Sequence, residues 1–518
     1  MPDGHAEISI VDTVYGRVRG SMQEGVSVFR CIPYGASTAG ANRFRPPQKP
    51  DSWTGVRDAL AFTGRAPQAG LNAALRPEME NFSGPPDPSP ETEDCLTVNI
   101  WTRAAGQGGK RPVMVWFHGG AFSTGNANAV RLQGSRLAQR EDVVVVNVNQ
   151  RLNIFGHLDL PGIPNSGNAG TLDMVAALEW VRDNIANFGG NPDNVTIFGE
   201  SGGGGKVSAL LAMPCARGLF HRAIIQSGAA VRFRTRERAA AVTQAVLREL
   251  GLRAEQIEEL QALPMERLLA AVKPAEKAIG PSPTPLFDRY PFGPVVDGVV
   301  LPNQPFDPAA TGISTDIPLI IGDMKDETAY FLAADDKFWH GALTGDELRA
   351  RVANLAGEHA DRVLVTYASM YPDASPADLL LAITTDCNFR IRSVVLAQRR
   401  AAQCAAPVWM YAFEWETPVL GGRLKAPHAM DVPFTFDTLD LTNATDLSHA
   451  ARKLAATMSS VWAAFAREGN PAHPSIPSWP VYRTPDRLTL ILDAQCRVER
   501  DPRGRSRRLW QEITGTTV

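Results

Sequence analysis

Residues 188–205 read FGGNPDNVTIFGESGGGG, and the predicted fold follows mainly from this segment. Residues 195–198 (VTIF) are apolar and partly β-branched, which indicates a buried parallel strand. Residues 202–213 begin with glycines and continue with apolar side chains at helical spacing. A strand that turns directly into a helix around Gly-x-Ser-x-Gly is a nucleophile elbow, which exposes its serine at the carboxyl edge of a sheet. The pattern therefore predicts a nucleophilic Ser201, with the N–H of Gly202 at the start of the helix beneath it.

The segments around this stretch alternate between strand and helix patterns. We expect strands at 96–101, 112–117, 143–148, 195–198, 223–226, 317–321, 408–413 and 487–492. We expect a short hairpin from 14–19 and 27–32, a surface loop at 64–92, a proline-rich loop at 281–285, and helices at 171–188, 236–251, 255–263, 265–273 and 448–468. The alternation predicts an α/β protein with a large, mostly parallel central sheet. Helical insertions at about 235–285 and 345–405 would form the walls of a gorge within a single catalytic domain, 1–518.

Composition and charge exclude several classes of protein. The 518 residues are 44% hydrophobic and 21% charged, as in soluble globular proteins. A net charge of -3 gives no nucleic-acid footprint, and the longest apolar runs are too short to span a membrane. The N-terminus lacks a signal-peptide pattern, and the six cysteines follow no metal or disulfide spacing. We therefore expect a cytoplasmic protein with reduced cysteines and neither nucleic-acid nor membrane partners.

A serine nucleophile needs a base, and the base needs an acid that fixes its tautomer. In this architecture the order along the chain is serine, acid, histidine, each after a sheet strand. Among the nine histidines, His428 is the candidate base because it follows both Ser201 and the strand at 408–413. The acid lies after the strand at 317–321, where Asp326 and Glu327 compete, and the residues alone do not choose between them.

An acyl-transfer intermediate also needs N–H donors around its oxyanion. Gly202, directly after the nucleophile, supplies one of them. The segment His118-Gly119-Gly120-Ala121 follows the strand at 112–117, and its glycines let adjacent N–H groups face one concavity. We interpret this segment as the oxyanion loop rather than a simple glycine turn.

Five segments give the chain a specific resemblance to the type-B carboxylesterase/lipase family, which includes the cholinesterases and bacterial carboxylesterases. They are FGGNPDNVTIFGESGG around the serine, EDCLTVNIW at 93–101, WFHGGAF at the loop, IGDMKDETAYF at the acid and HAMDVPFTF at the histidine. The resemblance covers nearly the whole length. It implies the α/β-hydrolase fold and the activity of a serine carboxylic-ester hydrolase.

The resemblance also assigns roles to individual residues. It implies Ser201 as the nucleophile, Glu327 rather than Asp326 as the acid, and His428 as the base. It further implies Gly120, Ala121 and Gly202 as oxyanion donors, with Glu200 and Ser227 as supporting residues behind them.

Three positions depart from the family pattern. The histidine is commonly followed by glycine, whereas this chain has Ala429, which we expect to narrow the site only slightly. The early cysteine that often pairs with the cysteine of EDCL is replaced by Ala66, so Cys95 loses its partner, which favours a reducing compartment. No tryptophan stands between Trp53 and Trp101, where cholinesterases place a cation-binding ring, so a choline-ester specialist is not expected.

These features together predict hydrolysis of small to medium uncharged organic esters through an acyl-enzyme, without metal or cofactor. The partner is a small-molecule ester, and we expect a monomer or weak homodimer. Amide or carbamate hydrolysis by the same residues is the alternative, and a non-catalytic cholinesterase-like binding protein is a remote one. Arg232 and Arg234 belong either to a solvated loop or to a site for an acidic or polar acyl group.

Overall fold

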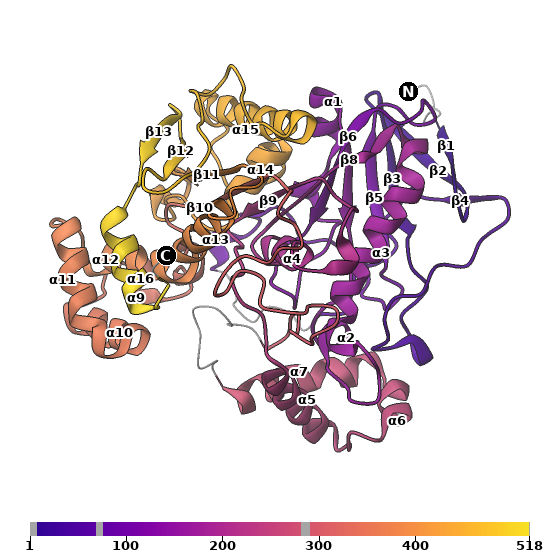
Figure 1. Cartoon of the computed structure of the whole chain (residues 1–518), viewed down its shortest axis with the longest axis horizontal. Helices are drawn as coiled ribbons and strands as arrows, with labels where there is room; N and C mark the ends of the chain where they lie inside the picture. Colours follow the sequence, from indigo (N-terminus) through magenta and orange to yellow (C-terminus); the bar gives the residue numbers. More distant parts are fainter. Residues whose placement is uncertain (1–7, 69–75, 281–290, 517–518) are drawn as a thin grey trace.

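A twisted β-sheet runs through the centre of the protein (Figure 1). The computed structural model describes residues 8–68, 76–280 and 291–516. Within these residues the strands are β1 Ile8–Thr13, β2 Gly16–Gln23, β3 Val26–Pro33, β4 Val56–Asp58, β5 Thr97–Thr102, β6 Arg111–Phe117, β7 Val144–Val148, β8 Gly190–Glu200, β9 Arg222–Gln226, β10 Leu319–Met324, β11 Val408–Phe413, β12 Leu488–Leu492 and β13 Arg497–Arg500.

The spatial order of the strands is β1-β2-β3-β5-β7-β6-β8-β9-β10-β11-β12-β13, and β4 pairs with β2. Every pair from β7 to β12 is parallel, whereas the flanking pairs in this order are antiparallel. The predicted mostly parallel sheet is therefore confirmed. Strand β8 lies near the middle of the parallel part, so its carboxyl end opens onto the centre of the sheet edge where α/β proteins place their sites.

Helices flank the sheet and extend from it (Figure 1). They are α1 Ser135–Glu141, α2 Asn153–His157, α3 Ala169–Asn184, α4 Gly202–Leu210, α5 Arg236–Leu250, α6 Ile257–Ala262, α7 Met265–Ile279, α8 Ala329–Leu332, α9 Asp336–Trp339, α10 Gly345–Ala356, α11 Ala360–Met370, α12 Pro376–Thr385, α13 Ile391–Ala401, α14 Asp431–Phe436, α15 His449–Glu468 and α16 Gly504–Ile513. Every helix of the described ranges is too short or too polar to cross a lipid bilayer.

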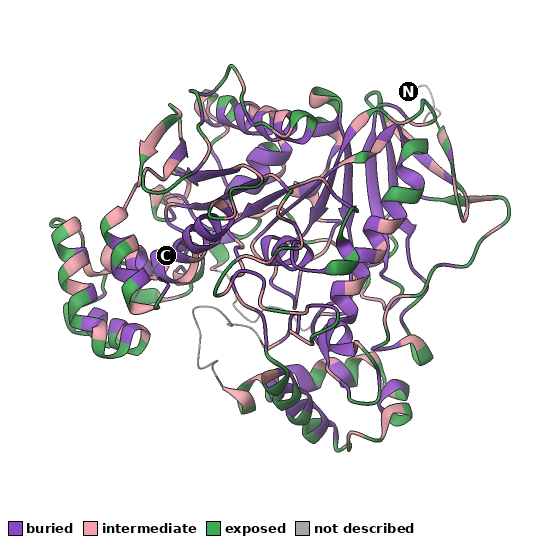
Figure 2. Ribbon diagram, viewed as in Figure 1, coloured by how far each residue is buried: buried purple, intermediate pink, exposed green. Residues whose placement is uncertain are grey.

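The core lies on both faces of the sheet, because the central strands are buried on both sides (Figure 2). Strand β6 shows the alternation: Val113, Val115 and Phe117 point into one apolar cluster, and Met114 and Trp116 point into the other. Helices α3 and α13 pack in the first cluster, and α1, α14 and α15 pack in the second. A third cluster joins α5, α6 and α7 to α2, at the bottom of Figure 1.

The chain departs from the predicted elements mainly at its ends. The expected hairpin is instead a set of three antiparallel strands, β1, β2 and β3, and β4 pairs in parallel with β2. Strand β13 and helix α16 were not predicted. The sequence of β13 (RVER) is that of a polar edge strand without an apolar alternation. Helix α7 continues through Pro274 to Ile279, beyond the expected end at residue 273. The loop at 281–285 and residues 69–75 of the loop at 64–92 lie outside the described residues.

Candidate active site

Ser201 lies between β8 and α4, at a sharp turn of the backbone. Its φ of 56° and ψ of -121° are strained for a side chain with a Cβ, and its N–H donates to the carbonyl of Gln226 at 2.8 Å. A Cβ added to Gly203 would lie 1.9 Å from the Phe117 carbonyl oxygen. Only glycine lets the helix approach β6 so closely, so the turn depends on this residue.

His428 and Glu327 meet behind this turn, although they come from different segments of the chain. Glu327 follows β10, and its Oε2 lies 2.5 Å from Nδ1 of His428. The backbone N–H of Met324 donates to the other carboxylate oxygen of Glu327 at 3.0 Å. Burial raises the pKa of Glu327 well above its ordinary value, while the Met324 N–H and the Ser227 hydroxyl lower it. A carboxylate in this position holds the proton on Nδ1 and leaves Nε2 as the basic nitrogen.

The structure distinguishes the two neighbouring carboxylates that the sequence left in competition. Strand β10 runs on to Met324, so Asp326 and Glu327 lie in the turn that follows it. Asp326 accepts a hydrogen bond from the N–H of Ala426 at 3.3 Å, whereas Glu327 is fully buried against His428. Of the two, it is Glu327 that contacts the imidazole.

Glu200 faces the opposite nitrogen of the same ring. Its Oε1 lies 3.1 Å from Nε2 of His428, and the side chain is almost completely buried. Burial raises the pKa of Glu200 to about 7, an effect that His428 opposes and that Asp431 and Glu327 reinforce. A group with this pKa exists in both protonation states near neutrality, and its charged form can pair with an imidazolium.

The predicted oxyanion loop lies directly beside the start of α4. Gly120 and Ala121 adopt φ values of 85° and 56°, and the carbonyl of Gly120 accepts hydrogen bonds from the N–H groups of Ser123 and Thr124. A Cβ added to Gly202 would lie 2.4 Å from the Ala121 nitrogen. The backbones of the three predicted donor residues are therefore close neighbours.

Two aromatic rings flank the imidazole. The ring centroids of Phe331 and Phe389 lie 5.1 and 4.9 Å from that of His428. Ala429, which follows the histidine, has a φ of 64°, a conformation that glycine adopts without strain. This positive φ explains why glycine suits position 429, where the family pattern commonly has it.

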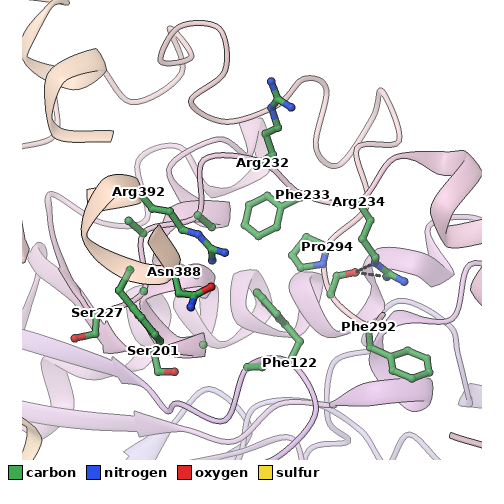
Figure 3. A pocket seen from close by; sticks show the side chains of 18 residues that line it. Phe122, Ser201, Ser227, Arg232, Phe233, Arg234, Phe292, Pro294, Asn388 and Arg392 are labelled. Carbon is green, nitrogen blue, oxygen red and sulfur yellow. Dashed lines mark hydrogen bonds between the residues drawn. The ribbon is translucent and has the colours of Figure 1, made fainter. Parts of the chain in front are cut away.

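Two cavities meet at Ser201. The smaller, of about 740 Å³ including space open to solvent, is lined by Ser201, Gly202 and Ser227 and by the apolar rings of Phe122 and Phe233 (Figure 3). The larger, of about 2750 Å³ on the same measure, is lined by Ser201, Glu200, His428 and the loop 118–121. Two cavities that share Ser201 have room for the two halves of a bipartite ligand.

Arg232 and Arg234 are both engaged by the protein itself. Arg232 Nε lies 2.6 Å from a carboxylate oxygen of Asp307, and Figure 3 shows its guanidinium turned away from Ser201. The Nε of Arg234 donates to the carbonyl of Gly293 at 3.0 Å, and another of its nitrogens donates to the carbonyl of His157 at 3.0 Å. These contacts favour a structural role for both residues over recognition of an acidic acyl group.

One residue near the site escaped the sequence interpretation. Lys206 lies in α4, about one turn after Ser201, and its ammonium is buried. Its signal in the sequence is a lysine within a segment that is otherwise small and apolar, GGGGKVSALLAM. A lysine in a helix is expected on a solvent-exposed face. The structure shows instead that every residue of α4 is buried, Lys206 included.

Known proteins are similar to this chain in both sequence and fold. Residues 7–510 match the carboxylesterase family. Para-nitrobenzyl esterase of Bacillus subtilis (strain 168) is 38% identical over 504 residues, which cover 96% of this chain and 97% of that protein. Phenmedipham hydrolase of Pseudarthrobacter oxydans is 34% identical over 503 residues, with 95% and 97% coverage. The crystal structure of a carboxylesterase from Geobacillus stearothermophilus is 38% identical, has a TM-score of 0.83 and is matched over 97% of this chain and 100% of that chain.

The chain therefore belongs to the type-B carboxylesterase family. It is a serine carboxylic-ester hydrolase with the α/β-hydrolase fold, as the resemblance of its motifs predicted.

Proposed function

We propose that Ser201, His428 and Glu327 form the catalytic triad of this esterase. The contact between Glu327 Oε2 and His428 Nδ1 carries the proposal, because it leaves Nε2 as the base. His428 and Ser201 line the same cavity, so the base and the nucleophile face one substrate. The order of these residues along the chain is also that of α/β hydrolases.

Hydrolysis then proceeds through two tetrahedral intermediates. Ser201 Oγ attacks the ester carbonyl carbon while His428 Nε2 takes its proton, and the carbonyl electron pair moves to oxygen. The N–H groups of Gly120, Ala121 and Gly202 stabilise this oxyanion. His428 returns the proton to the alkoxide as the carbon–oxygen bond breaks, which leaves the acyl group on Ser201. Water then attacks the acyl carbon while the same imidazole takes its proton. As the second tetrahedral intermediate collapses, the bond from this carbon to Ser201 Oγ breaks, His428 returns the proton to Oγ, and the carboxylic acid is released.

Glu200 and Ser227 support this machinery from behind. The carboxylate of Glu200, 3.1 Å from Nε2, stabilises the imidazolium that forms when Ser201 attacks. The hydroxyl of Ser227 opposes the rise in pKa that burial gives Glu327.

The substrates are small to medium organic esters that divide between the two cavities. The segments at about 235–285 and 345–405 are insertions into a single catalytic domain, 1–518. Their residues support this reading, because Val272 of α7 lines the larger cavity, and Asn388 and Phe389 line the smaller one. The rings of Phe122 and Phe233 in the smaller cavity favour uncharged acyl groups, and the polar Asn388 and Arg392 line the same cavity.

We further propose that the enzyme works in the cytoplasm as a monomer or weak homodimer. The six cysteines, all within the described residues, are free, and Ala66 stands where a partner for Cys95 would be needed. Burial raises the pKa of the Cys95 thiol, which keeps it protonated and inert. Such cysteines suit a reducing compartment.

A substrate series tests the proposed function. The enzyme and the Ser201→Ala variant would be compared on p-nitrophenyl esters from acetate to decanoate, and on a matched phenyl ester and anilide. We expect turnover of the esters by the wild type alone, with a much lower rate on the anilide because its leaving group needs firmer protonation. Faster cleavage of the anilide would make the protein an amidase, and equal ester turnover by Ser201→Ala would exclude Ser201 as the nucleophile.

A further inference from the structure

Lys206 places a charge-bearing group in the interior, next to the active site. Its side chain is only 1% exposed, and α4 is buried along its whole length. Burial lowers the pKa of Lys206 to about 7, and within the described residues no carboxylate offsets this effect. Burying an ammonium group without an ion-pair partner costs free energy, so its hydrogen bonds must replace the lost contacts with water.

The contacts of Lys206 converge on the first residue of the oxyanion loop. Its Nζ donates to the carbonyl oxygen of His118 at 2.8 Å. In the amide orientation that satisfies its neighbours, Gln150 Oε1 lies 3.0 Å from Nζ and 2.7 Å from Nε2 of the same histidine. The ammonium also lies 5.9 Å from the ring centroid of Phe122, at the far end of the loop.

The loop needs such an anchor because its backbone is strained. Gly120 and Ala121 both have positive φ, and a non-glycine residue such as Ala121 adopts this region at a cost of about 1–3 kcal/mol. A strained conformation persists only where surrounding contacts hold it. Such contacts lie on both sides of the strained pair: Lys206 donates to the His118 carbonyl, and the Asn153 N–H donates to the Phe122 carbonyl at 2.7 Å, directly after Ala121.

Lys206 also belongs to the helix that carries the other half of the site. Helix α4 begins at Gly202, the third proposed donor, directly after Ser201. A hydrogen bond from Lys206 to His118 therefore ties this half to the loop that holds Gly120 and Ala121. The relative placement of the three N–H groups depends on this tie, and donors that shift by 1 Å lose much of their effect on the transition state.

We propose that Lys206 is a positioning residue of the oxyanion hole, which fixes the loop 118–121 against the nucleophile helix. The inference rests on the proposed catalytic function and adds a group that does not touch the substrate itself. It acts on the transition state rather than on substrate binding, because the oxyanion exists only after Ser201 attacks.

The test compares Lys206→Met, which keeps the stem and removes the donor, with Ser314→Ala as the control. Ser314 Oγ donates to the Leu211 carbonyl at 2.7 Å, so the control removes a similar buried hydrogen bond beyond the far end of α4. For each protein, kcat and KM for p-nitrophenyl acetate would be measured. Affinities would be measured for a trifluoromethyl ketone, which forms a tetrahedral adduct with serine, and for the matching secondary alcohol, which does not.

We expect Lys206→Met to lower kcat about 10- to 100-fold with KM changed less than about threefold. The affinity for the ketone should fall in the same proportion, while the affinity for the alcohol stays unchanged. Ser314→Ala should change none of these values by more than about threefold. Lys206→Gln, which keeps a shorter donor, should fall between wild type and Lys206→Met, and it serves as the test if the methionine variant does not fold.

Two results would overturn the inference. One is a Lys206→Met enzyme with wild-type kcat and ketone affinity. The other is a loss that reduces ketone and alcohol affinities equally, since this indicates general damage to the site. Absence of turnover in the wild type would instead contradict the proposed function, so the two failures are distinguishable.

Discussion

Glu327 Oε2 lies 2.5 Å from His428 Nδ1, and the Glu327 side chain is fully buried behind the ring. A carboxylate in such a place is stable mainly because the imidazole and the Met324 N–H contact it. In the proposed triad it fixes the orientation and tautomer of His428 rather than contacting the substrate.

Replacing this acid tests its role directly. We expect Glu327→Gln to lower kcat by about 10³- to 10⁴-fold with little change in KM, because the amide no longer stabilises the imidazolium. Asp326→Asn is the matched control, since the neighbouring Asp326 contacts the Ala426 N–H, and its kcat should stay within about threefold of wild type. Steady-state rates on p-nitrophenyl acetate measure both, and equal losses would contradict the assignment.

Glu200 gives the protein a predictable dependence of stability on pH. Because burial raises its pKa from 4.5 to about 7, the folded state binds this proton more tightly than the unfolded state. Its contribution to stability is complete below pH 4.5 and is lost as the pH rises to about 7. Glu200→Gln has no such titrating group. Between pH 4.5 and about pH 7, the free energy of unfolding of the variant should therefore rise relative to that of wild type by up to about 3 kcal/mol. Urea unfolding at pH 4.5 and 7.5 measures the difference, and a gap independent of pH would contradict it.

The elbow should not tolerate a methyl group at Gly203. A Cβ there would lie 1.9 Å from the Phe117 carbonyl, so β6 and α4 must separate. We expect Gly203→Ala to lose about 3 kcal/mol of stability and most of its activity. Gly312→Ala meets no atom within 4 Å and serves as the control, with wild-type stability and activity. Denaturant midpoints would show the contrast, and an equally stable Gly203→Ala would refute the close packing.

The buried pair of Arg151 and Asp173 should stabilise the fold. Arg151 Nε lies 2.8 Å from Asp173 Oδ2, and both side chains are at most 1% exposed. Asp173→Ala leaves a buried guanidinium without its partner, and we expect a loss of about 3–5 kcal/mol in the free energy of unfolding. Asp183→Ala, which breaks an exposed pair with Arg182 on the same helix, should cost less than about 1 kcal/mol. Similar losses in the two variants would contradict the role of burial.

Much of the fold and site could be predicted from the sequence because their signals are local. The strand, turn and glycines around Ser201 lie within one short segment, and the apolar strands of the parallel sheet stand out by composition. Glu327 required the resemblance to a family, since only the fold shows which of two adjacent carboxylates turns toward His428. The contact of Glu200 with Nε2 likewise depends on segments far apart in the chain.

Other features could not be predicted because they depend on packing or lack apolar patterning. Strand β13 is a polar edge strand, and its pairing with β12 is what gives it structure. Lys206 resembles any helical lysine until the helix is seen to be buried on every side. The ion pair of Arg232 with Asp307 joins residues 75 positions apart, so the sequence left the role of this arginine open.

The most direct test of the account is a stopped-flow burst with p-nitrophenyl acetate on the wild type and Ser201→Ala. If Ser201 forms an acyl-enzyme, the wild type should release about one equivalent of p-nitrophenol per active site before steady turnover, and the variant should release none. A burst of the same size in Ser201→Ala would place the nucleophile elsewhere and contradict the proposed triad.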